Sequence, residues 1–285
     1  MCVRYIVHVH ETLQTETQIA HQVISPFQAI LDYEKSKGIP PGWINHSISA
    51  SSPNGSWQRL ERGEIKLDQG FFRDFKADLS DEKRWRAYYA RHLAATRKEK
   101  LSDAAEETAY QAPPPPDIDA EWLYWEMMRI ARAPDPHMYP ALQRLRAEAD
   151  ASDGALILCA LSNTSIFPPG HAYNNETTPE GKQNKALKAL FDVFVSSAHV
   201  GMRKPDEDIY RYTITRIHEF VKTRYGGDGV KAEDIVFLDD IGTNLRTAWR
   251  LGMGTIKVQL GRADKAVAEL EEVTGLKLKD EKARL

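Results

Sequence analysis

Hydrophobic and polar positions follow different patterns in the two halves of the chain. In the C-terminal half, short apolar runs predict strands at residues 155–161, 192–196, 234–238 and 255–258. An unbroken apolar run of this length is typical of a strand that is buried on both faces. Such strands, separated by helical segments, predict a parallel α/β sheet with right-handed crossovers.

Helical spacing of apolar residues supports the segments between these strands. The pattern predicts helices over residues 205–224 and 243–251. Pro205 suits a first helical turn, and Gly226 and Gly252 suit the two helix ends. The C-terminal half is therefore expected to be a Rossmann-like α/β unit.

The N-terminal half has a helical pattern for most of its length. Helices are predicted at about residues 26–38, 81–100, 119–132 and 139–150. A proline-rich stretch at residues 111–117 predicts an extended, exposed spacer. These segments are expected to form a helical module that is inserted into the α/β unit.

This organisation divides the chain into three expected parts. Residues 1–25 form an atypical N-terminal segment at the position of the first core strand, residues 26–140 form the helical module, and residues 141–285 form the α/β core. The fold class is thus an α/β protein with a Rossmann-like parallel sheet and an inserted all-helical domain.

Composition narrows the classes of partner. The chain has 285 residues and a net charge of -3. It therefore lacks the excess of Lys and Arg that is typical of proteins that bind nucleic acids or anionic membranes. Its apolar stretches are too short to cross a bilayer, and residues 1–24 lack a secretory signal pattern. Only Cys2 and Cys159 are present, and Cys159 falls in an apolar run where burial is expected. A reducing, cytoplasmic location is the expectation.

Polar side chains follow three of the predicted strands. Ser162 and Asn163 come directly after the first, Lys204 follows the second across a loop, and Asp239 and Asp240 follow the third. In open parallel sheets, ligands bind beyond the carboxyl ends of the strands. Adjacent carboxylates suit Mg²⁺, while a lysine and a hydroxyl group can orient a phosphoryl group. Together these residues indicate a phosphoryl site.

Each of these segments also has an ordinary structural interpretation. A Ser-Asn pair after a strand commonly forms a turn or a helix cap, a loop lysine is commonly solvated, and adjacent acids can cap the following helix. Only their order at three successive strand ends favours a functional interpretation over these alternatives.

Three segments carry a resemblance to a known family. Leu-Ser-Asn at residues 161–163, Arg-Lys-Pro-Asp at 203–206 and Phe-Leu-Asp-Asp-Ile-Gly-Thr-Asn at 237–244 are similar to the second, third and fourth motifs of haloacid-dehalogenase-like hydrolases. The chain looks like the phosphatase domain of bifunctional epoxide hydrolases and the related domains linked to acyl-CoA dehydrogenases. Residues 25–30 and 57–65 resemble segments of that subgroup's helical cap.

The resemblance implies a role for each matching residue. Ser162 and Asn163 would bind the phosphoryl oxygens, and Lys204 would balance the charge of the phosphate and the nucleophile. Asp240 would be a ligand of Mg²⁺, and Asp239 a second ligand or a partner of the ligands. The implied activity is magnesium-dependent hydrolysis of a small phosphorylated molecule. A haloacid dehalogenase-type hydrolase is the enzymatic alternative, although its chemistry needs no metal and so leaves the paired acids unexplained.

The family's first motif, a strand ending in a nucleophilic aspartate, is not found. No aspartate precedes Asp32, and the only acids before the first predicted helix are Glu11 and Glu16. Residues 3–9 could supply the strand, but it ends in His8 and His10 rather than in acids. We therefore expect impaired turnover.

Three explanations of this difference are open. In the first, the chain is a pseudoenzyme that keeps a binding or regulatory site. In the second, the N-terminus comes from an alternative or mispredicted exon, and the abrupt change in the sequence near Ser25 favours this explanation. In the third, Glu16 or a histidine acts as the nucleophile. The longer reach of glutamate argues against the last explanation. A further histidine, His171, lies in a loop after the second motif and is expected at the surface.

Overall fold

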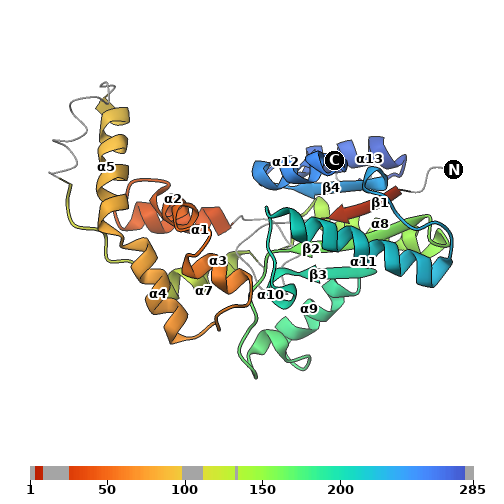
Figure 1. Ribbon diagram of the computed structural model, residues 1–285, viewed down its shortest axis with the longest axis horizontal. Helices are drawn as coiled ribbons and strands as arrows, with labels where there is room; N and C mark the ends of the chain where they lie inside the picture. Colours follow the sequence, from red (N-terminus) through yellow and green to blue (C-terminus); the bar gives the residue numbers. More distant parts are fainter. Residues whose placement is uncertain (1–3, 9–25, 98–111, 132–133, 280–285) are drawn as a thin grey trace.

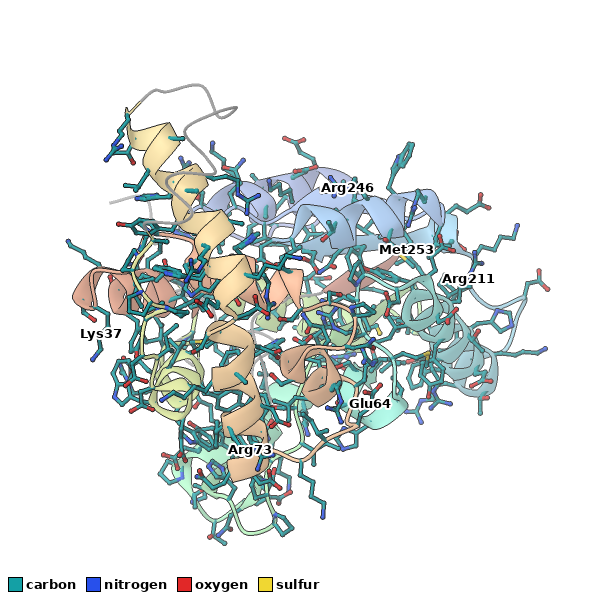
Figure 2. All side chains as sticks on the ribbon, turned by 60° about the vertical axis from the view of Figure 1, so that its left-hand side comes forward. Lys37, Glu64, Arg73, Arg211, Arg246 and Met253 are labelled. Atoms are coloured by element: carbon teal, nitrogen blue, oxygen red, sulfur yellow. The ribbon has the colours of Figure 1, made fainter. Side chains whose placement is uncertain are left out.

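The computed structural model describes residues 4–8, 26–97, 112–131 and 134–279. Figure 1 shows a sheet flanked by helices and, beside it, a group of helices from the first half of the chain. Charged side chains such as Lys37, Arg73 and Arg211 point outward from these parts (Figure 2).

The sheet has five strands in the order β3-β2-β1-β4-β5, and every neighbouring pair is parallel. The strands are β1 (Arg4–His8), β2 (Leu156–Ser162), β3 (Val193–Ser196), β4 (Ile235–Asp239) and β5 (Gly254–Lys257). The four strands predicted in the C-terminal half are all present. The possible strand near the N-terminus is also present, and it occupies the centre of the sheet.

Both faces of the sheet are covered, as the apolar runs indicate. Along β2, Leu156, Leu158 and Ala160 pack into one core cluster, while Ile157 and Cys159 pack into the other. This alternation follows from the period of two residues in a strand. Because both faces are buried, every position of β2 is apolar until the strand ends.

Helices form the two outer layers of this α/β unit. The first cluster includes residues of α8 (Met138–Ala151) and α13 (Ala263–Thr274), and the second includes residues of α11 (Glu207–Tyr225) and α12 (Gly242–Arg250). The α/β architecture with a parallel sheet is confirmed. The remaining elements of this part are α9 (Pro179–Lys188), α10 (Ser197–Val200) and the short 3₁₀ turns η1 (Ala172–Asn174) and η2 (Ala232–Asp234).

The helical module has a hydrophobic cluster of its own. Its helices are α1 (Pro26–Ser36), α2 (Trp43–Ala50), α3 (Ser56–Glu61), α4 (Gln69–Leu79), α5 (Glu82–Arg97) and α7 (Ala120–Ile130). Aromatic residues dominate its centre, where the rings of Trp57 and Phe75 lie 5.2 Å apart and those of Phe71 and Tyr124 lie 5.6 Å apart. In Figure 1 the module faces the carboxyl edge of the sheet, where a ligand site is expected.

The start of one predicted helix is wrong. The helix expected from residue 205 begins at Glu207, with Asp206 as its N-cap in an extended conformation, so Pro205 precedes the helix. The described part of the proline-rich spacer, residues 112–117, is non-helical as predicted, and the carbonyl of Pro113 accepts a hydrogen bond from Trp85 Nε1 at 2.7 Å. Among the described helices, no segment has the length and apolar character that a bilayer crossing requires.

Candidate functional site

Lys204 and Asp239 meet at the carboxyl edge of the sheet. The Nζ of Lys204 lies 3.1 Å from Oδ2 of Asp239, and both side chains are 0% exposed. The same ammonium group donates to the carbonyl of Leu161 at 3.3 Å. The ends of β2 and β4 and the loop after β3 are therefore joined by one buried cation.

Asn163 fixes the backbone on which Lys204 sits. Its Oδ1 accepts from the amide of Lys204 at 2.8 Å, and its Nδ2 donates to the carbonyl of the same residue at 3.1 Å. Ser162, which is 1% exposed, lies next to Asn163, and its Oγ donates to the Asn163 carbonyl at 3.3 Å. Ser162, Asn163 and Lys204 thus lie close together, as expected for residues that follow the carboxyl ends of parallel strands.

The carboxylate of Asp239 is occupied by several protein donors. Besides Lys204, it accepts from the amide of Ile241 at 2.7 Å, and from Nδ2 of Asn244 at 3.2 Å to each oxygen. Sequence reasoning did not assign Asn244 to the site. Its position in the first turn of α12, five residues after Asp239, is the signal that could have identified it, because a helix start turns this side chain back toward the strand end.

Asp240 is the other acid of the pair. It is half-buried, and both of its carboxylate oxygens are shielded from solvent. Within the described ranges, no three His, Cys, Asp or Glu side chains are grouped so as to hold a metal ion. Carboxylate oxygens are the ligands that Mg²⁺ prefers, and Asp239 and Asp240 are the two such groups that follow β4.

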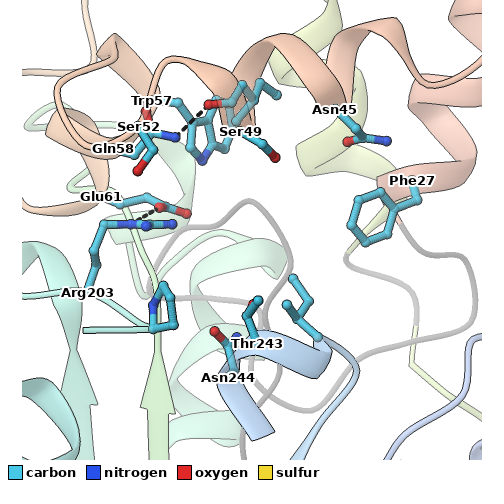
Figure 3. Close-up of a pocket in the computed structure, with 13 residues that line it drawn as sticks. Phe27, Asn45, Ser49, Ser52, Trp57, Gln58, Glu61, Arg203, Thr243 and Asn244 are labelled. Carbon is cyan, nitrogen blue, oxygen red and sulfur yellow. Dashed lines mark hydrogen bonds and ion pairs between the residues drawn. The ribbon is translucent and has the colours of Figure 1, made fainter. Parts of the chain in front are cut away.

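A cavity of about 370 Å³ lies between the helical module and the α/β unit. Phe27, Ile48 and Trp57 line it from the module, and Arg203 and Asn244 line it from the core (Figure 3). The predicted site residues do not themselves line this cavity, but the chain neighbours of Lys204 and Asp240 do. The cavity therefore adjoins the buried cluster rather than enclosing it.

A second buried ion pair lies on the cavity wall. Nε of Arg203 donates to Oε2 of Glu61 at 2.7 Å, and the two side chains are 14% and 2% exposed (Figure 3). Sequence reasoning gave neither residue a role of its own. The pair connects α3 of the helical module to the residue that directly precedes Lys204.

The loop after β2 also contacts the helical module. The hydroxyl groups of Tyr124 and Ser165 lie 2.7 Å apart, and burial raises the pKa of Tyr124 well above its usual value. His171, which was expected at the surface, is half-exposed, and its ring stacks on Phe167 at 4.6 Å and on Trp125 at 5.2 Å. This loop therefore helps to hold the module against the core.

The central strand ends close to this cluster. His8, the last residue of β1, is level with Ala160 of β2 and Leu238 of β4, one position before Asp239. The other N-terminal residues considered as nucleophiles or ligands, Glu11, Glu16 and His10, lie outside the described residues. The strand position of the first motif is therefore filled, and no aspartate precedes Asp32 in the sequence.

Comparisons with known proteins agree with the sequence motifs. The chain is 26% identical over 250 residues to bifunctional epoxide hydrolase 2 of Sus scrofa, a match that covers 86% of this chain and 35% of the relative. It is 23% identical over 256 residues to acyl-CoA dehydrogenase family member 10 of Mus musculus, covering 90% of this chain and 18% of the relative. The chain thus spans about a third or less of the length of these relatives. No protein-family model matches the sequence.

Solved structures give more distant matches. A predicted HAD-like family hydrolase from Porphyromonas gingivalis is 19% identical, with a TM-score of 0.45 and coverage of 95% of this chain and 98% of the other. A HAD family enzyme from Bacteroides thetaiotaomicron, in complex with magnesium and inorganic phosphate, is 12% identical with a TM-score of 0.39, and the match covers 91% and 96% of the two chains. The sequence matches confirm the expected resemblance to a bifunctional epoxide hydrolase and to a member of the acyl-CoA dehydrogenase family.

Proposed function

We propose that the carboxyl edge of the sheet is a magnesium-assisted site for a phosphate monoester of a small molecule, with turnover impaired in this chain. The observation that carries the proposal is the buried cluster in which Asn163, Lys204 and Asp239 join three strand ends. A buried lysine held in one position supplies the charge compensation that phosphoryl groups require.

Each residue of the cluster has a distinct part in this proposal. Lys204 provides positive charge, and Asp239 with the Leu161 carbonyl holds its ammonium group in place. Ser162 supplies a hydroxyl donor for a phosphoryl oxygen, and Asn163 keeps the two loops together. Asp240 would hold Mg²⁺, which neutralises phosphoryl oxygens when it is bound.

The cavity between module and core is where we place the organic part of the substrate. Its wall is mainly apolar, with Phe27, Ile48 and Trp57 on the module side. We divide the chain into an N-terminal segment (1–25), a helical module (26–140) and an α/β core (141–285). In this division the helical module contacts the organic part of the substrate. We further propose a cytoplasmic location, which suits a chain with only two cysteines.

Impairment follows from the sequence at the first-motif position. Hydrolysis through an aspartyl intermediate needs an aspartate at the end of the central strand, and no aspartate occurs before Asp32. Without this carboxylate the site can bind a phosphate group but lacks the aspartate to which the phosphoryl group would transfer.

The test is an assay with p-nitrophenyl phosphate and Mg²⁺. The native chain is compared with a variant whose residues 1–10 are replaced by a strand ending in Asp-x-Gly. Turnover in the restored variant alone supports a phosphatase site that lacks its nucleophile. Equal turnover by the native chain, lost in Asp240→Asn, would show that the chain is not impaired. Halide release from a haloacid without Mg²⁺ would instead support the dehalogenase alternative.

The missing aspartate also favours a second candidate, a non-catalytic binding or regulatory module that uses the same site. Calorimetric titration with Mg²⁺ and inorganic phosphate separates the two. Binding by the native chain, together with no turnover even in the restored variant, favours the binding module. Turnover in the restored variant favours the enzymatic lineage.

A further inference from the structure

We propose that Glu61 of the helical module is a positioning residue for the phosphate site, because it holds the two loops that carry Asn163 and Lys204. This inference rests on the proposed phosphate-binding function. It assigns to one residue of the module a direct mechanical connection to both loops of the site.

Glu61 lies between the cavity and the core. It is the last residue of α3, it is 2% exposed, and it lines the cavity together with Trp57 and Gln58 of the same helix (Figure 3). A group that enters the cavity therefore contacts the helix that presents Glu61 to the core.

The side chain of Glu61 is bound to the loop of Lys204. Its Oε2 accepts from Nε of Arg203 at 2.7 Å, and Arg203 is the residue immediately before Lys204. A charge-assisted hydrogen bond between two largely buried groups is short and directional. It restrains the backbone from which the Lys204 ammonium group is projected.

The main chain of Glu61 is bound to the loop of Asn163. The hydroxyl of Ser197 donates to the carbonyl of Glu61 at 2.5 Å and accepts from the amide of Thr164 at 2.7 Å. Thr164 directly follows Asn163, and Ser197 and Thr164 are both fully buried. One hydroxyl group therefore connects the module to the residue after Asn163.

The end of α3 fits closely against the core at this point. Gly63 has a φ of +66°, and a Cβ placed on it would lie 2.1 Å from the carbonyl oxygen of Ala198. The backbone of the module thus contacts α10 without an intervening side chain. Movement of α3 would pass to both loops instead of being absorbed by flexible side chains.

Stability alone is a weak explanation for the Glu61–Arg203 pair. Taking both charges out of water offsets most of their mutual attraction, so a buried ion pair of this kind often adds little to folding. A positioning role predicts an effect on phosphate affinity that a purely structural role would not produce.

The experiment measures the affinity of the full chain for inorganic phosphate in saturating Mg²⁺ by calorimetry. Glu61→Ala is expected to weaken phosphate binding about tenfold, as loss of a supporting hydrogen-bond partner commonly does. Glu61→Gln keeps an oxygen that can accept from Arg203, so it should recover part of the affinity. The matched control is Glu64→Ala, which removes an exposed ion pair with Arg62 near the same helix end and should bind like the native chain.

The outcomes separate this inference from the proposed function. Failure of the native chain to bind phosphate would overturn the phosphate site itself. Native binding with unchanged affinity in Glu61→Ala would overturn only the role of Glu61. If Glu61→Ala does not fold, Ser197→Ala removes the hydroxyl between Glu61 and Thr164 with less disturbance. Weaker phosphate binding by that variant supports the inference, and native affinity overturns it.

Discussion

At the scale of single residues, the Lys204–Asp239 ion pair determines how much stability is lost when one of its residues is substituted. Both side chains are completely buried. Replacing Lys204 with Met would leave the carboxylate of Asp239 buried without its cation, and breaking such a pair costs about 3–5 kcal/mol. We expect this loss in the free energy of unfolding, measured by urea denaturation. The double variant Lys204→Met/Asp239→Asn should recover part of it, and a single-variant loss below about 1 kcal/mol would contradict the expected burial.

Cys159 gives a prediction about chemical reactivity. The thiol is fully buried within the sheet, and burial raises its pKa far above the usual range. The reactive thiolate is therefore absent even at pH 9. In a Cys2→Ser variant, native protein should resist iodoacetamide at that pH, whereas urea-unfolded protein should take up one label. Labelling of the native variant at the unfolded rate, followed by mass spectrometry, would show that Cys159 is accessible.

Residues of the site were predictable where they follow a strand. Ser162, Lys204 and the acidic pair at 239–240 were identified because parallel strands end at a common edge. Glu61 could not be identified in this way, since 142 positions separate it from Arg203 and only the docking of the module brings them together. Asn244 acts within a helix turn, where an asparagine is ordinarily a polar surface residue.

At the scale of elements, the start of α2 depends on a buried carboxylate. Glu34 accepts from the amides of Gly42 at 2.7 Å and Ile44 at 2.8 Å, and burial raises its pKa above the usual 4.5 despite these bonds. Between pH 4.5 and the raised pKa, the folded chain keeps a proton that the unfolded chain has released. Raising the pH through this window therefore favours unfolding.

The matched variant is Glu34→Gln, which does not titrate. The stability of the native chain relative to this variant is expected to fall as the pH rises from 4.5, when urea denaturation curves of both are recorded at pH 4 to 7. A relative stability that rises with pH would mean that the hydrogen bonds to Gly42 and Ile44, and not burial, dominate the pKa of Glu34.

The junction between α3 and α10 is tested by a pair of glycines. Gly63 and Gly38 both have positive φ, but only Gly63 has a carbonyl oxygen where a Cβ would lie. Gly38→Ala should cost about 1–2 kcal/mol from the left-handed backbone alone. Gly63→Ala should cost about 1–3 kcal/mol more, because the methyl group pushes the module from the core. Equal losses in urea denaturation would show that the junction yields easily.

A helix or strand was predictable when the apolar pattern of its own residues was enough to identify it. β2 was evident because both of its faces are buried, so the run is apolar throughout. Among the helices that were not predicted, α2 and α3 are short, and each is preceded by a glycine that makes no side-chain cap. The longer α4 was also not predicted, although the side chain of Asp68 caps its start. The start of α11 was misplaced because Pro205 was assigned to the first turn, whereas the extended Asp206 follows this proline as the N-cap.

At the scale of the whole molecule, β1 connects the two halves of the sheet. β2 pairs with β1 along Arg4 to His8, and β4 pairs with the other edge of β1 along Tyr5 to His8. The order of strands could not be read from the sequence, since pairing between residue 4 and residue 156 is set by tertiary structure. Only the resemblance of the later motifs pointed to a strand near the N-terminus.

Removal of β1 should therefore unfold the core and not merely trim its edge. Deleting residues 1–8 would leave β2 and β4 without a partner on their inner edges, and the unpaired backbone groups of a buried strand cannot be satisfied there. We expect loss of the near-ultraviolet circular dichroism of the aromatic residues and loss of a cooperative unfolding transition. Deleting residues 1–3 keeps β1 and should leave both signals intact. If the longer deletion also unfolds cooperatively at the native urea midpoint, the central position of β1 does not stabilise the sheet. An N-terminal strand with a different ending could then replace β1 whether or not it pairs with β2 and β4.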